Sequence, residues 1–160
     1  LVRLVKRKGN KLVDVTDTKE DTQEFLRHGA YRYEAGCGGL YGTITDYEHM
    51  ARMLCSNGMY QGKQFLKPET VCLMHTEAQK QHLEPEPGFT WGLSVKIRQN
   101  PELSGSYAHK GTYGWSGAFG THFFVCPDEK LEAVFMTNRS DLGGSGSYIS
   151  EKVEELVFGS

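Results

Sequence analysis

The stretch Gly111-Thr-Tyr-Gly-Trp-Ser-Gly-Ala-Phe-Gly-Thr-His-Phe-Phe-Val125 decides how this chain is organised. Glycine recurs at every third position from Gly111 to Gly120, and a bulky apolar run follows. Glycine lets other atoms approach the backbone closely and allows dihedrals that other residues resist. The stretch therefore predicts a strand edge that presents an N–H to a ligand oxygen beside an aromatic ring. A bulged strand whose glycines serve only packing is the alternative that the spacing leaves open.

The segments around this stretch predict an antiparallel meander closed by a helix. Apolar and polar residues alternate over Phe89–Arg98, which predicts one strand. Two further strands are expected over Phe119–Cys126 and Leu131–Thr137, joined by a turn at Pro127–Lys130. A last amphipathic helix follows Ser147, and its inward residues are expected to be Ile149, Val153, Leu156 and Val157.

The N-terminal half predicts short strands followed by helices. Two strands are expected within Leu1–Val15. Thr45 and Glu48 have the spacing of a capping box, so a helix is predicted from Thr45 to Asn57-Gly58. A hairpin is expected over Met59–Phe65, and Pro68 suits the first turn of a second helix. The fold class is α+β with an antiparallel sheet, in one domain over 1–160 with segments 1–30, 31–88 and 89–160.

Composition excludes several classes of function. The formal net charge is -2, so no strong field favours nucleic acid. No apolar run approaches the length of a membrane span. Cysteine and histidine are scattered without ligand spacing, which predicts neither a metal nor another cofactor. Unpaired cysteines slightly favour a reducing, cytoplasmic compartment.

Four stretches of the chain carry a family resemblance. They are Gly38-Gly-Leu-Tyr-Gly-Thr-Ile-Thr-Asp-Tyr47, Met53–Gly58 with Phe65–Val71, Tyr113-Gly-Trp-Ser-Gly-Ala-Phe-Gly120, and Val125–Glu129 with Leu131–Met136. In this order they resemble the C-terminal part of the serine β-lactamase-related family, which includes class C β-lactamases, penicillin-binding proteins and family VIII-type esterases. The resemblance covers most of the chain from about Tyr31 onward, and it implies the β-lactamase/penicillin-binding (serine transpeptidase-like) fold.

The third of these stretches resembles the third catalytic motif of the family in its esterase form, Trp-x-Gly. On that resemblance Trp115, Ser116 and Gly117 form the motif, and the backbone N–H of Ala118 donates to the developing oxyanion. A second register places Thr112-Tyr-Gly114 on the motif and gives the N–H to Trp115. His109-Lys-Gly111 is a third variant, too far ahead of the hairpin. The wall of the acyl pocket is expected to include Tyr113, Thr112, Tyr41 and Tyr107.

The nucleophile of the family lies in a Ser-x-x-Lys helix, and no serine of this chain has lysine three residues on. We therefore expect the chain to be the C-terminal portion of a serine hydrolase that acts on an ester, amide or β-lactam. It would supply the oxyanion strand, and it would be inactive alone. The expected partners are a small acyl substrate and an N-terminal half or second chain, with self-association through exposed apolar surface.

Two alternatives are a non-catalytic binding module on the same scaffold and an unrelated α+β domain. An upstream Ser-x-x-Lys would favour the enzyme, and its absence would favour the binding module. The lysine of the lactamase motif, which would hold a substrate carboxylate by charge, is replaced here. Esterase or transacylase activity is therefore expected over penicillin hydrolysis.

Overall fold

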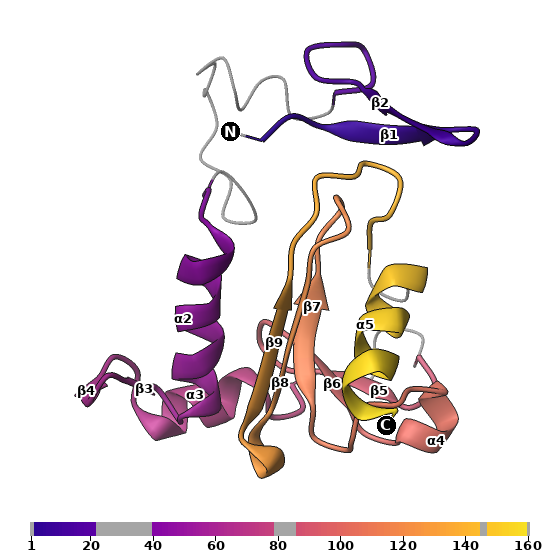
Figure 1. Cartoon of the computed structure of the whole chain (residues 1–160). Coiled ribbons are helices and arrows are strands. Elements are labelled where there is room, and N and C mark those ends of the chain that lie inside the picture. Colours follow the sequence, from indigo (N-terminus) through magenta and orange to yellow (C-terminus); the bar gives the residue numbers. More distant parts are fainter. Residues whose placement is uncertain (1, 22–39, 79–85, 145–146, 160) are drawn as a thin grey trace.

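A five-stranded antiparallel sheet in the order β5-β6-β7-β8-β9 lies at the centre of the computed structural model (Figure 1). The structure describes residues 2–21, 40–78, 86–144 and 147–159. The first two residues of the predicted Gly38–Tyr47 stretch lie outside the described residues. The strands are β5 (Phe89–Trp91), β6 (Lys96–Arg98), β7 (Tyr113–Ser116), β8 (His122–Cys126) and β9 (Leu131–Phe135).

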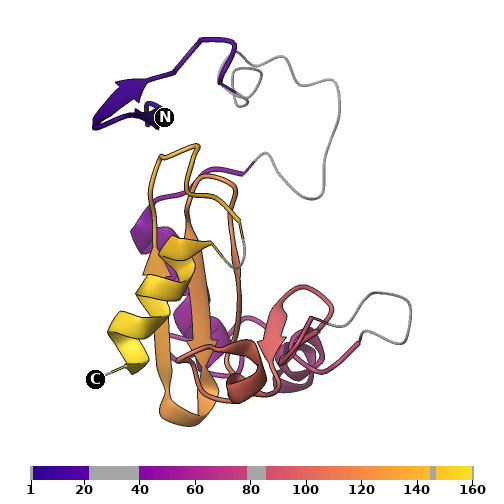
Figure 2. The same ribbon diagram turned by 90° about the vertical axis from the view of Figure 1, so that its right-hand side faces the viewer.

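Two helices cover the opposite faces of this sheet. Helix α2 (Ile44–Cys55) lies against one face, and helix α5 (Tyr148–Phe158) lies against the other (Figures 1 and 2). Tyr113, Phe123 and Val125 point from the sheet toward α2, where they form the main apolar core with residues such as Leu54. The α+β fold class is confirmed. No helix among the described residues has the length and apolar character that crossing a bilayer requires.

The short elements of the N-terminal half follow the local sequence signals. Strands β1 (Val5–Lys8) and β2 (Lys11–Asp14) form the expected hairpin. Val5 docks this hairpin onto the segment after β9, because its N–H donates to Asn138 O at 3.0 Å and its carbonyl accepts from Ser140 N–H at 3.0 Å. The other predicted elements are also present, as β3 (Met59–Tyr60), β4 (Lys63–Gln64) and α3 (Pro68–Met74).

The single strand predicted over Phe89–Arg98 is wrong, because the segment folds back on itself. Strands β5 and β6 pair with each other, with Phe89 opposite Arg98. Gly92 sits in the turn, where its N–H donates to Val95 O at 2.9 Å. A Cβ at this position would overlap the Met74 carbonyl, so the turn requires glycine. The expected turn after β6 contains the helical turn α4 (Pro101–Ser104), and the 3₁₀ helix η1 (Pro127–Glu129) joins β8 to β9.

The capping box of α2 lies two residues earlier than predicted. Thr43, and not Thr45, is the N-cap, and its hydroxyl accepts from Asp46 N–H at 3.1 Å. Asp46 reciprocates by accepting from Thr43 N–H at 3.0 Å. The backbone N–H and the hydroxyl of Thr43 lower the pKa of Asp46. Both threonines have an acidic residue three positions on, so spacing alone does not distinguish them.

The inward face predicted for α5 is wrong in part. Leu156 is 80% exposed, while Ser150 and Glu154 are the buried residues of the helix. The sheet face that α5 covers explains why Glu154 is buried, because Arg98 and His122 lie on that face and contact Glu154. Helix α5 therefore packs on the sheet with a polar stripe.

Candidate functional site

Strand β7 continues past the end of its neighbour β6. The last residue of β7 with a partner on β6 is Gly114, opposite Lys96. On its other side β7 stays paired with β8 as far as Ser116, opposite His122. One edge of the predicted motif is therefore open from Trp115 onward.

Some backbone N–H groups of the motif are hydrogen-bonded within the sheet, and others are not. Gly117 N–H donates to Thr121 O at 2.8 Å. Hydrogen-bonded pairs recur at every second residue of an antiparallel ladder, so Trp115 and Phe123 form such a pair and the Trp115 amide faces β8. Ala118 is exposed, and no acceptor within the described ranges takes its N–H.

A loop after β9 holds the turn that carries Ala118. Gly144 N–H donates to Gly117 O at 3.1 Å. Gly143 lies directly against the Ala118 backbone, where a Cβ would overlap the Ala118 carbonyl oxygen. The position of the Ala118 N–H is therefore set by a close approach of two backbones, which glycine permits.

A small cavity lies beside this turn, on the α2 face of the sheet. Its volume is about 150 Å³, and its lining includes Trp115, Gly117 and Phe123 from the sheet with Tyr47 from α2. The ring of Tyr47 meets Phe123 edge-on with centroids 5.3 Å apart. Trp115 is 40% exposed, and its ring lies 4.6 Å from that of Trp91. The motif thus borders an aromatic recess that reaches the surface.

Tyr113 was predicted to line the acyl pocket, but its side chain lies in the core. It is 1% exposed, and its ring stacks on His75 with centroids 4.5 Å apart. Its hydroxyl donates to Leu54 O at 3.4 Å, and burial raises the pKa of this phenol well above its ordinary value. The side chain of Tyr113 therefore packs the sheet against α2.

The other three predicted wall residues are not among those that line the recess beside Trp115. Thr112 and Tyr107 line a different cavity, the one beside α5. Thr112 is buried, and its hydroxyl has no hydrogen-bond partner in the described part of the chain. Tyr41 is half exposed and precedes α2.

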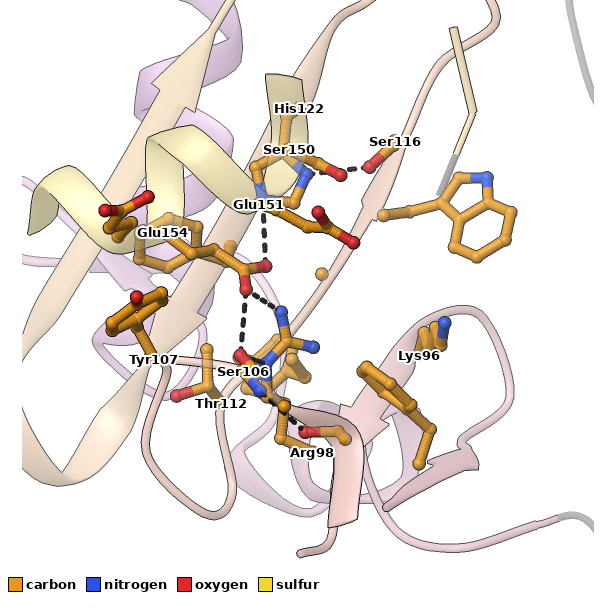
Figure 3. Close-up of a pocket in the computed structure, with 18 of the residues that line it drawn as sticks. Lys96, Arg98, Ser106, Tyr107, Thr112, Ser116, His122, Ser150, Glu151 and Glu154 are labelled. Atoms are coloured by element: carbon orange, nitrogen blue, oxygen red, sulfur yellow. Dashed lines mark hydrogen bonds and ion pairs between the residues drawn. The ribbon is translucent and has the colours of Figure 1, made fainter. Parts of the chain in front are cut away.

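The side chain of Ser116 points to the α5 face, away from the recess beside Trp115. Its Oγ lies 2.8 Å from Nδ1 of His122, and Nε2 of His122 lies 3.2 Å from Oε1 of Glu154. The second contact is an ion-pair contact and not a well-aligned hydrogen bond. Glu154 also accepts from Ser106 Oγ at 2.9 Å and pairs with Arg98 (Figure 3). These side chains form a continuous polar chain, which we call the Ser116–Glu154 network.

The carboxylate of Glu154 is kept charged in this network. Burial alone would raise the pKa of Glu154, but the contact with His122 and the charge of Arg98 outweigh burial and lower the pKa. A cavity of about 310 Å³ lies beside the network, and Tyr107 and Tyr148 connect it to the surface.

A comparison with known protein families identifies the family of this chain. The family model described as Beta-lactamase matches residues 6–157. The chain belongs to the beta-lactamase family. Its sheet and helices also match EstCE1, "a hydrolase with promiscuous acyltransferase activity", with a TM-score of 0.78 and 22% identity over 98% of this chain and 43% of that one. The β-lactamase-related fold is thereby confirmed.

Curated relatives support the same family and are much longer. Protein Rv1367c of Mycobacterium tuberculosis is 32% identical over 110 residues, which cover 62% of this chain and 27% of that protein. Esterase EstB of Burkholderia gladioli is 26% identical over 116 residues, which cover 71% of this chain and 28% of that protein. The chain thus spans less than a third of these relatives, and esterases are among the proteins that it resembles.

The fold of this beta-lactamase-family chain also brings together possible metal-ligand side chains whose spacing in the sequence does not indicate a site. Donor atoms of His109, Cys126 and Glu129 lie within 4.8 Å of one another. His109 is already ion-paired with Glu129, and its ring packs 5.1 Å from that of Phe158. Sequence reasoning also missed the Ser116–Glu154 network, because its five members lie on five separate segments. The one sequence signal was Glu154, which lies three residues before Val157, a residue predicted to face inward.

Proposed function

We propose that this chain supplies the oxyanion-binding strand of a β-lactamase-related serine hydrolase that forms an acyl-enzyme. The observation that carries the proposal is the N–H of Ala118, which has no acceptor among the described residues and lies at an exposed turn beside an aromatic recess. An N–H held in place before the reaction is suited to a developing oxyanion, because no reorganisation is needed when the charge appears.

Strand pairing favours Ala118 over Trp115 as the donor. The Trp115 amide faces β8 and takes part in the ladder, so it is not available to a ligand without breaking the sheet. A Cβ at Gly117, which lies between them, would meet the side-chain oxygen Oγ1 of Thr121. We therefore adopt the register in which Trp115-Ser-Gly117 is the third catalytic motif.

We infer an uncharged ester or amide as the substrate class. Trp115 occupies the position at which related lactamases carry a lysine, and an indole cannot hold a substrate carboxylate by charge. The neighbouring ring of Trp91 extends the aromatic surface. Esterases among the relatives agree with this choice. Anionic penicillins should be poor substrates, and efficient penicillin turnover would refute the assignment.

The donor is tested in the complete gene product by replacing Ala118 with proline, which removes the N–H. We expect kcat for a p-nitrophenyl ester to fall by about 100- to 1,000-fold, with KM little changed. Ala118→Gly keeps the N–H and serves as the matched control. Circular dichroism checks that both variants are folded. Equal activity of the proline and glycine variants would rule out the Ala118 donor.

The division of labour is tested by comparing two proteins. The chain Leu1–Ser160 should show no steady-state ester hydrolysis, because it lacks Ser-x-x-Lys. The complete gene product should hydrolyse the ester, and a serine in an upstream Ser-x-x-Lys should carry the acyl group. A complete product that binds acyl compounds without turnover would support a binding module on the same scaffold instead.

A further inference from the structure

Ser116, His122 and Glu154 have the relationship of a nucleophile, a base and a group that orients the base. The hydroxyl lies 2.8 Å from Nδ1 of His122, within the reach that proton transfer requires. The other ring nitrogen lies 3.2 Å from Glu154 Oε1. With the proton on Nε2, the ring faces Glu154 through its N–H and leaves Nδ1 free to accept the Ser116 proton.

The base is held firmly on both sides. Glu154 is 5% exposed and is fixed from the sheet side by Arg98 and Ser106. Strand β8 places the His122 ring against Phe124, with ring centroids 5.7 Å apart. Glu154 therefore lies beside the ring before the imidazole takes up a proton.

We propose that Ser116 is an activated acyl-acceptor site, separate from the Ala118 donor and independent of Ser-x-x-Lys. The cavity of about 310 Å³ beside α5 supplies the space, and it combines the aromatic rings of Phe89, Tyr107 and Tyr148 with charges of both signs. Its ligand class is a small activated ester whose leaving group is aromatic. This proposal does not rest on the proposed function, which concerns the opposite face of the sheet.

Backbone geometry provides a donor for the oxyanion at this second site. Ser116 lies beyond the last β6 partner, so β6 offers no residue opposite it. Because alternate residues of β7 face β8, the N–H of Ser116 points to the open edge. The N–H of a nucleophilic serine itself serves as an oxyanion donor in serine proteases.

The reaction is a single acyl transfer. Ser116 Oγ forms a bond to the acyl carbon while its proton passes to His122 Nδ1, and the ester C–O bond breaks as the phenolate leaves. The imidazolium then returns its proton to the phenolate or to water. The products are O-acyl-Ser116 and the free phenol, one equivalent per chain, and we propose no turnover.

The test uses the 160-residue chain with p-nitrophenyl acetate and with a fluorophosphonate. We expect a burst of one equivalent of nitrophenolate, and a single adduct that peptide mass spectrometry places on Ser116. Ser116→Ala should abolish both. His122→Asn should slow labelling by about 100-fold or more, because the base is lost. Ser94→Ala removes an exposed serine without a base and should leave labelling unchanged.

The pH dependence gives a readout that a structural role would not produce. The charged groups that line the cavity beside His122 are Glu151, Lys152, Glu154 and Glu155 from α5, Lys96 and Arg98 from β6, and Glu86. The pH profile of labelling in the wild type should differ from that of His122→Asn, because only the wild type carries the base. Mapping the wild-type adduct keeps the test decisive even if Ser116→Ala does not fold. A folded wild-type chain with no adduct on Ser116, or with labelling there no faster than at Ser94, overturns the proposal.

Discussion

Glu154 on the last helix pairs with Arg98 on β6, and both side chains are almost fully buried, at 6% and 12% exposed. The pair joins the end of the chain to the middle of the sheet. Two buried charges are tolerated because each compensates the other, and Ser106 hydrogen-bonds to both side chains. The cohesion of the sheet with α5 therefore depends on charge complementarity as well as on apolar packing.

Removing one member of this pair should destabilise the protein strongly. We expect Glu154→Ala to lower the free energy of unfolding by about 3–5 kcal/mol, because Arg98 would be left buried without its partner. Urea denaturation measures the change. Glu155→Ala is the matched control on the next position of α5, and it should have little effect because Glu155 pairs with Lys152 near the surface. Similar losses for both variants would contradict the buried-pair account.

The same carboxylate should make stability depend on pH. The pKa of Glu154 is lowered from its ordinary value of 4.5 in the folded state, so the folded state favours the charged form. Its contribution is present above pH 4.5 and is lost as the pH falls through the lower folded pKa. Urea midpoints measured between neutral pH and the acid range should decline more steeply for the wild type than for Glu154→Gln. Parallel profiles would assign the acid sensitivity to other groups.

The N-cap of α2 can be identified by a pair of substitutions. Thr43→Ala should cost about 1 kcal/mol, because the hydroxyl that accepts from Asp46 N–H is lost. Thr45→Ala removes the residue that sequence spacing predicts as the cap, and it should be close to neutral because Thr45 lies inside the helix. Thermal unfolding followed by circular dichroism separates the two. A larger loss for Thr45→Ala would restore the sequence-based boundary.

Gly143 should be intolerant of a side chain. Gly143→Ala places a Cβ on the Ala118 carbonyl, so the loop or the β7–β8 turn must move, at a cost of about 1–3 kcal/mol. Gly42→Ala is the control, because its nearest new neighbour, Asp46 Cβ, lies 3.8 Å away. The complete enzyme should also lose kcat in Gly143→Ala if the Ala118 N–H is displaced. Unchanged stability and kcat would show that the contact does not position the turn.

Local signals predicted the elements whose stability depends on near neighbours. The hairpin at Met59–Gln64, the helix from Pro68 and the hairpin after β8 are all present. Boundaries that depend on distant contacts were missed. The segment Phe89–Arg98 alternates like one strand, yet the packing of Gly92 on Met74 breaks it into two.

The candidate site shows the same difference between features set by local sequence and features set by distant contacts. The position of the Trp115-Ser-Gly117 motif on a strand edge was predicted from glycine spacing and family resemblance. Sequence pattern placed Tyr113 in a substrate pocket, whereas the register of β7 turns its side chain into the core. A one-residue change of register reverses the face of every side chain, and the register depends on partners elsewhere in the chain.

The sequence alone determined the family, the α+β class and the stretch that carries the motif, because these depend on residue order and short-range periodicity. Only the tertiary structure decided which face of α5 is buried and which side chain accompanies Ser116. Periodicity favours apolar residues on the inward face of a helix. Here Arg98 and His122 on the sheet require an opposite charge, so Glu154 is buried and Leu156 is left in solvent.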